Sequence, residues 1–263
     1  MTPGAAGDHG VPAAGTPLQA VLAAHHWLNG EEPSVAGSRP APAGSSVSLP
    51  VPGLPVVPLE QAMAARRSSY HFDPGPLPLE RLAGLLHHAL GPSRRVAAHG
   101  RPDHPLSRSP SAGGLNSVQV SVAATRVHPL APGVYRYDLD GHRLLGVTDG
   151  DPRSALASCY VQREFADACA ATVVLSARLG PALERYPPRH YRTLHVDAGI
   201  AVQSLYLVAT ALELACCAVA GYHDEQARRL VRAADDEVVT VLVALGKRQA
   251  RVAARPVGAA RPW

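Results

Sequence analysis

The stretch TLHVDAGIAVQSLYLVATALELACCAVAG, residues 193–221, decides the fold. Residues 193–214 have the length of a helix and are apolar on nearly every side, which predicts a helix surrounded by protein rather than half in water. Residues 214–221 continue as an apolar run typical of a buried strand. We therefore expect a central helix that leads directly into a sheet.

Further strands are predicted on both sides of this unit. Toward the C-terminus, the pattern predicts a helix at 224–233 and a strand at 237–246. Toward the N-terminus, it predicts strands at 116–127 and 170–178 and a hairpin at 133–147, in which Asp140-Gly141 favours a type I′ turn.

The region before these strands is predicted to be helical and then irregular. It contains helix patterns at 59–67 and 77–90, and the second carries leucines at helical spacing (Leu79, Leu82, Leu85, Leu86 and Leu90). Residues 92–110 are rich in Pro, Arg and His and are predicted to be a loop. Helices and strands mixed around one sheet predict an α+β fold.

Composition indicates one folded domain with two irregular ends. Residues 1–58 are rich in Pro, Gly and Ala and are expected to form an arm with a short helix at 17–28. The domain is expected over 59–247, and 248–263 is a basic tail. The N-terminus lacks the pattern of a signal peptide, so we expect a cytoplasmic protein.

Charge and motif content argue against several classes of function. The net charge is +4, but the basic residues are spread along the chain and aromatic residues are only 5%, so no nucleic-acid partner is expected. No apolar run without charged residues is long enough to cross a membrane, so no membrane span is expected. Cysteines and histidines show no CxxC or HExxH spacing, and no metal is assigned.

Four polar or glycine-containing clusters lie at predicted element ends, where binding sites are commonly built. They are RRSSYHF (66–72), SPSAGGLNS (109–117), VAGYHD (219–224) and GKRQAR (246–251). Arg66, Arg67, Lys247 and Arg248 could together neutralise a phosphate. Gly113-Gly114 lets backbone N–H groups approach a ligand closely.

The order and spacing of these clusters resemble the nitroreductase-like flavoenzymes over about residues 59–247. The PSAG segment followed by the PGVYRY hairpin resembles most the SagB-type dehydrogenases, which oxidise thiazolines and oxazolines in ribosomally made peptides. The resemblance implies a nitroreductase-like α/β/α sandwich with a central mixed, mainly antiparallel sheet. It also implies a homodimer that binds FMN at its interface.

The resemblance assigns the cofactor contacts residue by residue. The phosphate contacts are Arg66, Arg67 and Ser68 with Lys247 or Arg248. The residues along the flavin ring are Pro110, Ser111 and Ala112, followed by Asn116, with Gln203 on the long helix and Ala220 and Gly221 at the N5 edge. Tyr70 stands where the family usually has a basic residue, which removes one phosphate partner.

The catalytic assignment departs from the family. Its azoline oxidases carry a Lys-Tyr pair ahead of the central helix, and this chain has Arg185-Tyr186. Arginine is a poor proton acceptor because its pKa exceeds about 12. The candidate bases are Tyr186 by resemblance and His190 or His195 by their pKa range, with Tyr191 nearby, and Asp197 stands where the family has an acid. Arg185 is expected to hold an anionic group.

Three functions are compatible with this pattern. The first is an FMN-dependent dehydrogenase that oxidises azolines in a modified precursor peptide, with a cyclase as a further partner. The second is an NAD(P)H-dependent nitro or ene reductase. The third is a flavin-free scaffold subunit of a peptide-maturation complex.

Overall fold

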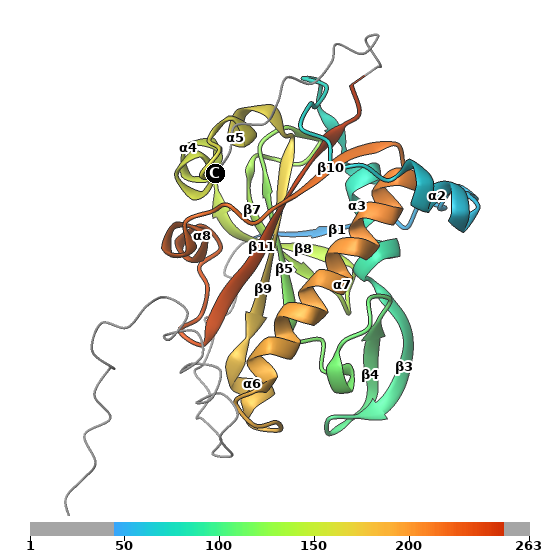
Figure 1. The fold of residues 1–263 in the computed structure, drawn as a ribbon, viewed down its shortest axis with the longest axis vertical. Coiled ribbons are helices and arrows are strands. Elements are labelled where there is room, and N and C mark those ends of the chain that lie inside the picture. Colours follow the sequence, from blue (N-terminus) through green and yellow to red (C-terminus); the bar gives the residue numbers. More distant parts are fainter. Residues whose placement is uncertain (1–44, 250–263) are drawn as a thin grey trace, which may run out of the picture.

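A seven-stranded sheet forms the middle layer of the fold (Figure 1). The computed structural model describes residues 45–249. The strands follow the order β1-β8-β7-β5-β9-β11-β10, and every neighbouring pair is antiparallel. They are β1 (Ser46–Ser48), β5 (Val118–Ala124), β7 (Gly133–Asp138), β8 (Arg143–Asp149), β9 (Ala171–Arg178), β10 (Leu214–Val219) and β11 (Glu237–Lys247).

Alternation along the strands gives the sheet two apolar faces. In β11, Val243 and Leu245 belong to the core on one face, and Leu242 and Ala244 to the core on the other. The first face is covered by α3 (Leu79–Leu90) and α7 (His190–Ala211), and the second by α4 (Arg153–Cys159), α5 (Glu164–Ala168) and α8 (Asp224–Leu230). The expected α/β/α sandwich is confirmed.

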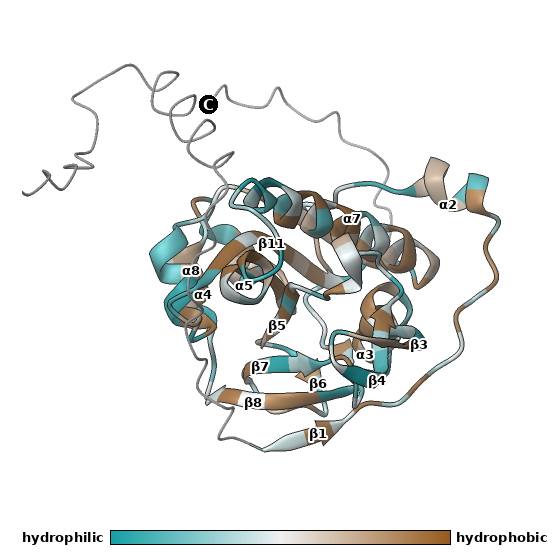
Figure 2. Cartoon of the chain, turned by 90° about the horizontal axis from the view of Figure 1, so that it is seen from below, coloured by the Kyte–Doolittle hydropathy of each residue, from teal (hydrophilic) through white to brown (hydrophobic). Residues whose placement is uncertain are grey.

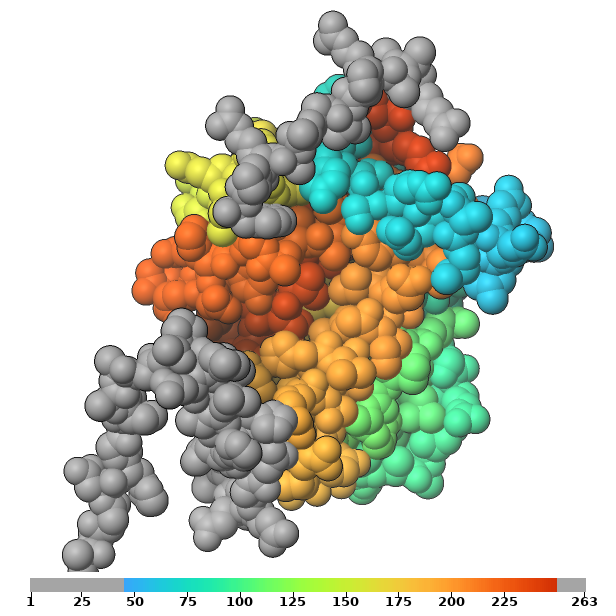
Figure 3. Space-filling view, in the orientation of Figure 1, coloured from blue at the N-terminus to red at the C-terminus, as the bar shows by residue number. Residues whose placement is uncertain are grey.

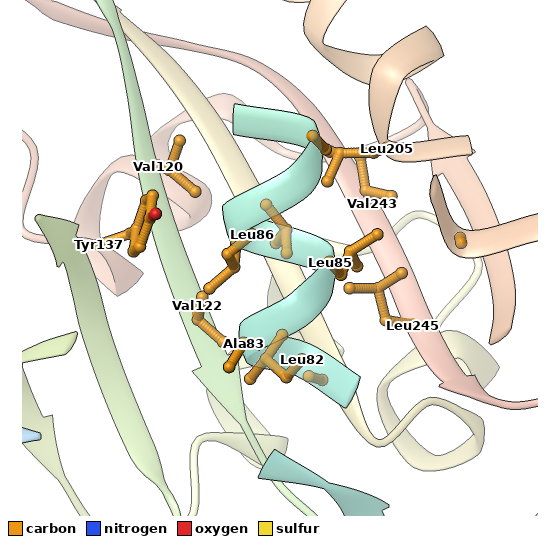
Figure 4. Close-up of a cluster of buried hydrophobic side chains, with 14 of the residues drawn as sticks. Leu82, Ala83, Leu85, Leu86, Val120, Val122, Tyr137, Leu205, Val243 and Leu245 are labelled. Carbon is orange, nitrogen blue, oxygen red and sulfur yellow. The ribbon is translucent and has the colours of Figure 1, made fainter. Parts of the chain in front are cut away.

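Helix α3 packs against both the sheet and α7. Its buried face includes Leu82, Leu85 and Leu86, each fully buried. Figure 4 shows these side chains between Val120 and Val122 of β5 on one side and α7 and β11 on the other. Figure 2 shows hydrophobic stretches along α3, α7 and β11. Burial of this face at roughly 1.5–3 kcal/mol per leucine is a main contribution to folding.

Shorter elements complete the described part of the chain. They are α2 (Leu59–Ala65), α6 (Leu179–Leu183), the 3-10 turn η1 (Ala112–Gly114), the parallel pair β2 (Leu77–Pro78) and β6 (Val127–His128), and the antiparallel pair β3 (Pro92–Ala98) and β4 (Arg101–Ser107). The helices α4, α5 and α6 and the strands β1, β2 and β6 had no counterpart in the sequence-based prediction.

The prediction of a loop over 92–110 is wrong. Residues 92–107 form the β3–β4 hairpin, which projects at the lower right of Figure 1. His99 and Gly100, both with positive φ, form its turn. Prolines at 92, 102 and 105 hide the strand pattern because proline cannot donate a ladder hydrogen bond and is confined to edge strands.

Two boundary predictions also need correction. The domain begins before residue 59, since β1 pairs with β8 in the main sheet and Leu49 is buried in the core. In the hairpin at 133–149, the positive φ lies at His142 and not at Asp140 or Gly141, so the turn is not type I′. The helix expected at 17–28 and the tail after 249 lie outside the described residues.

One face of α7 is open, contrary to the expectation that protein surrounds it. Val196 and Ile200 are 59% and 36% exposed, and Gly199 and Gln203 are exposed beside them. Figure 3 shows α7 running along the surface. In the described part of the chain, α7 is the one helix with the length and hydropathy of a membrane span, and its other face packs in the core.

Candidate functional site

Backbone contacts join the two segments that carry the cationic residues predicted to bind phosphate. The segment after α2 crosses the ends of β10 and β11. The Ser69 N–H donates a hydrogen bond to the Cys216 carbonyl (2.9 Å), and the Asp73 N–H donates one to the Lys247 carbonyl (3.0 Å). These contacts bring residues 66–68 and 247–248 into one neighbourhood, although some 180 positions of sequence separate them.

Tyr206 of α7 supports the first of these segments. Its hydroxyl lies 2.9 Å from the Ser68 hydroxyl and accepts a hydrogen bond from the Ala218 N–H at 2.7 Å. The Arg66 guanidinium lies over the Tyr206 ring, 5.3 Å from its centre. Burial raises the pKa of Tyr206, so its hydroxyl stays protonated. The Tyr206 ring therefore positions Arg66, and the Tyr206 hydroxyl positions Ser68.

The remaining cations have protein partners that a phosphate would compete with. The Arg67 guanidinium donates to the carbonyls of Ala64 (2.6 Å) and Arg66 (2.7 Å). The Lys247 ammonium lies 3.4 Å from an Asp73 carboxylate oxygen. The pKa of Asp73 is lowered, first by the Gly75 N–H and then by Lys247. Arg66, Ser68 and half-exposed Lys247 remain the predicted donors to a phosphate, which charge-assisted hydrogen bonds would suit.

The Pro110–Asn116 loop is fixed to α7 and to β4. The Ala112 N–H donates to the Asp197 carboxylate at 3.0 Å. The Asn116 N–H donates to the Ser111 hydroxyl (3.1 Å), and the Asn116 side-chain amide donates to the Pro105 carbonyl (2.6 Å). Asn116 also has a positive φ of 51°. Its side chain therefore holds the hairpin against the loop.

Tyr186, His190 and Asp197 lie behind this loop. The rings of Tyr186 and His190 are stacked, with centroids 4.4 Å apart and an angle of 17°. A Cβ at Gly113 would overlap the Tyr186 hydroxyl, so the phenol lies directly against the loop backbone. Burial lowers the pKa of His190, which keeps the imidazole neutral, and burial raises the pKa of the Asp197 carboxyl.

The other predicted catalytic residues lie on the surface. Arg185 is exposed between α6 and α7. His195 is also exposed, and its Nδ1 lies 2.9 Å from the Tyr191 carbonyl. Of the candidate bases, Tyr186 therefore contacts the loop at Gly113, His190 stacks on Tyr186, and His195 is engaged within its own helix.

The remaining predicted cofactor contacts lie along the open side of α7 and at the end of β10. The Gln203 amide is exposed and lies 3.8 Å from the Met63 sulfur of α2. Ala220 is exposed, and the Gly221 carbonyl accepts a hydrogen bond from the Val161 N–H at 3.0 Å. Tyr70, 61% exposed, packs its ring 6.0 Å from that of Phe165.

The predicted cofactor residues form two groups along α7. Tyr206 contacts Arg66 and Ser68 of the first group. Asp197 accepts a hydrogen bond from the Ala112 N–H of the second group, the Pro110–Ala112 loop. The two residues are nine positions apart in one helix, or about 14 Å along its axis. The residues predicted to hold the phosphate and the loop predicted to lie along the flavin ring thus contact α7 at separate points, with Gln203 between them.

Two histidines of the hairpin were missed by the sequence analysis. His99 Nε2 lies 2.9 Å from the Gly113 carbonyl, and His104 Nε2 lies 2.8 Å from the Gly114 carbonyl. Between the hairpin and the loop lies an open cleft of about 670 Å³. The spacing HxxxxH gives no signal of its own, because only the pairing of β3 with β4 brings both rings to the loop.

Comparisons with known proteins agree with this architecture. A model of the nitroreductase family matches residues 63–247. A Methanocaldococcus jannaschii protein that carries the name nitroreductase is 25% identical over 190 residues, which cover 72% of this chain and 91% of the relative.

Solved structures share the fold at low identity. A protein named as a nitroreductase from Anabaena variabilis superposes with a TM-score of 0.73 at 23% identity, over 95% of this chain and 52% of that one. This chain thus spans about half the length of the Anabaena protein. A chain of the E. coli microcin synthetase McbBCD complex with truncated pro-MccB17 bound gives 0.58 at 18% identity, over 91% and 84% of the two chains. An oxidoreductase containing FMN gives 0.51 at 17%, over 74% and 79%.

Proposed function

The chain belongs to the nitroreductase family, and on that premise we propose that it is an FMN-dependent dehydrogenase that oxidises azolines in a modified peptide. The family typically binds FMN. The observation that carries the proposal is the placement of the Tyr186 hydroxyl against Gly113, with His190 stacked on the Tyr186 ring, beside the loop expected to face the flavin. A thiazoline would leave the site as a thiazole.

The donor set of the chain fits the two ends of FMN. Arg66, Ser68 and Lys247 would hold the phosphate, with Arg67 and Arg248 beside them. The loop from Pro110 to Ala112 would lie along the flavin ring, together with Ala220 and Gly221. When bound, FMN would supply the redox chemistry, as the acceptor of a hydride from the azoline ring, and oxygen would be the final oxidant.

A second copy of the chain would bring these two ends together. The open face of α7, with Val196 and Ile200, has the apolar character of an interface. A two-fold axis beside this face would set the loop of one protomer opposite the cationic group of the other. We therefore propose a homodimer with two FMN sites at its interface.

His190 is suited to take the proton that leaves the azoline carbon. It is buried, its pKa is lowered by burial, and its Nε2 has no hydrogen-bond partner among the described residues. A neutral imidazole with a free nitrogen is a competent base near neutral pH. Tyr186, the base candidate by resemblance, stacks on His190 and would hold the imidazole ring in place.

Arg185 has a different role in this proposal. Its exposed guanidinium binds an anionic group of the peptide or of an intermediate. Arg185→Ala should lower turnover while the bound flavin stays, whereas flavin loss in that variant would contradict this role.

Mass spectrometry tests the function directly. The purified protein, which should be yellow and absorb at about 450 nm, is incubated with a cyclised azoline peptide and should remove about two daltons per ring. His190→Gln should retain the colour and lose most of the oxidation. Unchanged mass across several thiazoline and oxazoline peptides would contradict the dehydrogenase.

The family name also supports a second candidate, an NAD(P)H-dependent nitro or ene reductase. Rapid bleaching of the flavin by NADPH without oxygen, with turnover of a nitroarene, would favour it. A third candidate is a flavin-free scaffold that accompanies a cyclase. Colourless protein that FMN cannot reconstitute, yet that co-purifies with a cyclase, would favour this one.

A further inference from the structure

The cleft between the β3–β4 hairpin and the Pro110–Asn116 loop has the size of a ligand site. Its volume of about 670 Å³ falls within the roughly 300–1,000 Å³ usual for such sites. Val96, Ala98 and Leu106 give it an apolar wall. The loop gives it a floor of backbone and hydroxyl groups, including Gly113, Gly114 and Ser111, so the cleft opens onto the segment expected to face the flavin.

One charged residue, Arg94, lines this cleft. The neighbouring arginines Arg95 and Arg101 both pair with Asp140 and Asp103. Arg94 is exposed, and no carboxylate among the described residues pairs with it. Its guanidinium is therefore available to an anion that enters the cleft.

The floor also holds a buried polar atom that lacks a partner. Ser109 is 6% exposed, and its hydroxyl makes no hydrogen bond among the described residues. Such a group costs about 1–3 kcal/mol when it is left unsatisfied. A ligand with a backbone carbonyl or N–H would satisfy it.

We propose that this cleft binds the peptide that flanks the azoline, and that Arg94 recognises an acidic side chain of that peptide. This inference rests on the proposed function. Apolar walls, backbone groups and a single cation suit a peptide with one carboxylate. A nicotinamide dinucleotide carries at least two phosphate charges and would need more than one arginine.

Binding is tested with fluorescein-labelled octapeptides that contain one thiazoline. A series carries glutamate at one of the four positions on either side of the ring, and a matched series carries glutamine there. Affinities for the FMN-loaded protein are measured by fluorescence anisotropy. We expect one glutamate position to bind about fivefold more tightly than its glutamine match, as an exposed ion pair allows.

Variants assign this preference to Arg94. Arg94→Ala should abolish it without weakening the glutamine peptides, Arg94→Lys should keep most of it, and Arg94→Glu should favour a lysine peptide instead. Arg229→Ala is the matched control, because Arg229 is an exposed arginine on α8, away from the cleft. All variants should keep the flavin absorbance.

Two outcomes would overturn the inference. One is equal affinity for glutamate and glutamine peptides at every position, and the other is an Arg94→Ala variant that weakens both series alike. The mass change of the same peptides separates this inference from the proposed function. Oxidation without a glutamate preference rejects only the role of Arg94, and an Arg94-dependent preference without oxidation rejects only the dehydrogenase.

Discussion

Gly113 lies where the loop backbone meets Tyr186. Its φ is +60°, a left-handed conformation that costs other residues about 1–2 kcal/mol, and a Cβ there would also overlap the Tyr186 hydroxyl. Gly113→Ala should therefore lower the free energy of unfolding by more than about 2 kcal/mol and reduce flavin retention.

Gly100→Ala is the matched control for this prediction. Gly100 has a similar φ of +74° but nothing within 4 Å of a Cβ, so it shares the backbone cost without the overlap. Tyr186→Phe combined with Gly113→Ala should recover part of the loss. Equal destabilisation by the two alanine variants in chemical unfolding would show that the Tyr186 contact is unimportant.

His87 predicts a pH dependence of stability. Its pKa is lowered from 6.5 to about 4, first by burial and then by His142, Arg108 and His88. The unfolded chain thus binds a proton at a higher pH than the folded one, so this group reduces stability as the pH falls from about 6.5 to about 4. Above that window, His87 has no such effect.

Replacing His87 should remove this part of the pH dependence. The stability of wild type relative to His87→Gln should fall steadily between pH 6.5 and pH 4 in urea unfolding. His195→Gln, at an exposed position on α7, is the control and should track wild type. A wild-type curve parallel to that of His87→Gln would contradict the half-buried, neutral imidazole.

At the scale of elements, Glu237 ties β11 to its neighbours. It is fully buried and accepts hydrogen bonds from Arg136 of β7 (3.2 Å), Ser176 of β9 and the Ala234 N–H (3.1 Å). Removing one partner of a buried pair leaves the other charge uncompensated, at about 3–5 kcal/mol. Glu237→Ala should lower the free energy of unfolding by that order.

The surface pair on α8 gives the comparison for Glu237. Glu225 and Arg229 are 2.9 Å apart, exposed and one turn apart in the helix. Glu225→Ala should cost at most about 0.5 kcal/mol. Similar losses for the two alanine variants, measured by thermal unfolding, would mean that burial of the Arg136–Glu237 pair adds nothing.

Elements were predictable where their periodicity was clean. Helix α3, strand β9 and strand β11 appear close to their predicted ranges because each carries a continuous apolar pattern. The β3–β4 hairpin was not predictable, because its prolines and arginines mask the strand pattern. Its strands are stabilised mainly by pairing with each other.

At the scale of the whole molecule, the open face of α7 predicts association. Val196→Glu with Ile200→Glu should convert the proposed dimer to a monomer and release FMN, since each flavin site would use both protomers. Light scattering measures the mass, and the absorbance at about 450 nm measures the bound flavin.

Val51→Glu is the control for the α7 variant. Val51 is 60% exposed and follows the edge strand β1, so a charge there should change neither mass nor colour. A wild-type protein that is monomeric and still retains FMN would contradict the shared site.

The sequence by itself determined the α+β class, the central helix and strand at 193–221, and which short clusters carry the polar groups of the site. Local patterns suffice for these because helix and strand periods extend over only a few residues. The tertiary structure alone decided that Asp197 holds the Ala112 N–H, 85 positions away, that the hairpin forms a wall beside the loop, and that one side of α7 stays uncovered. These features depend on strand order and on how helices cross the sheet, which no local period encodes.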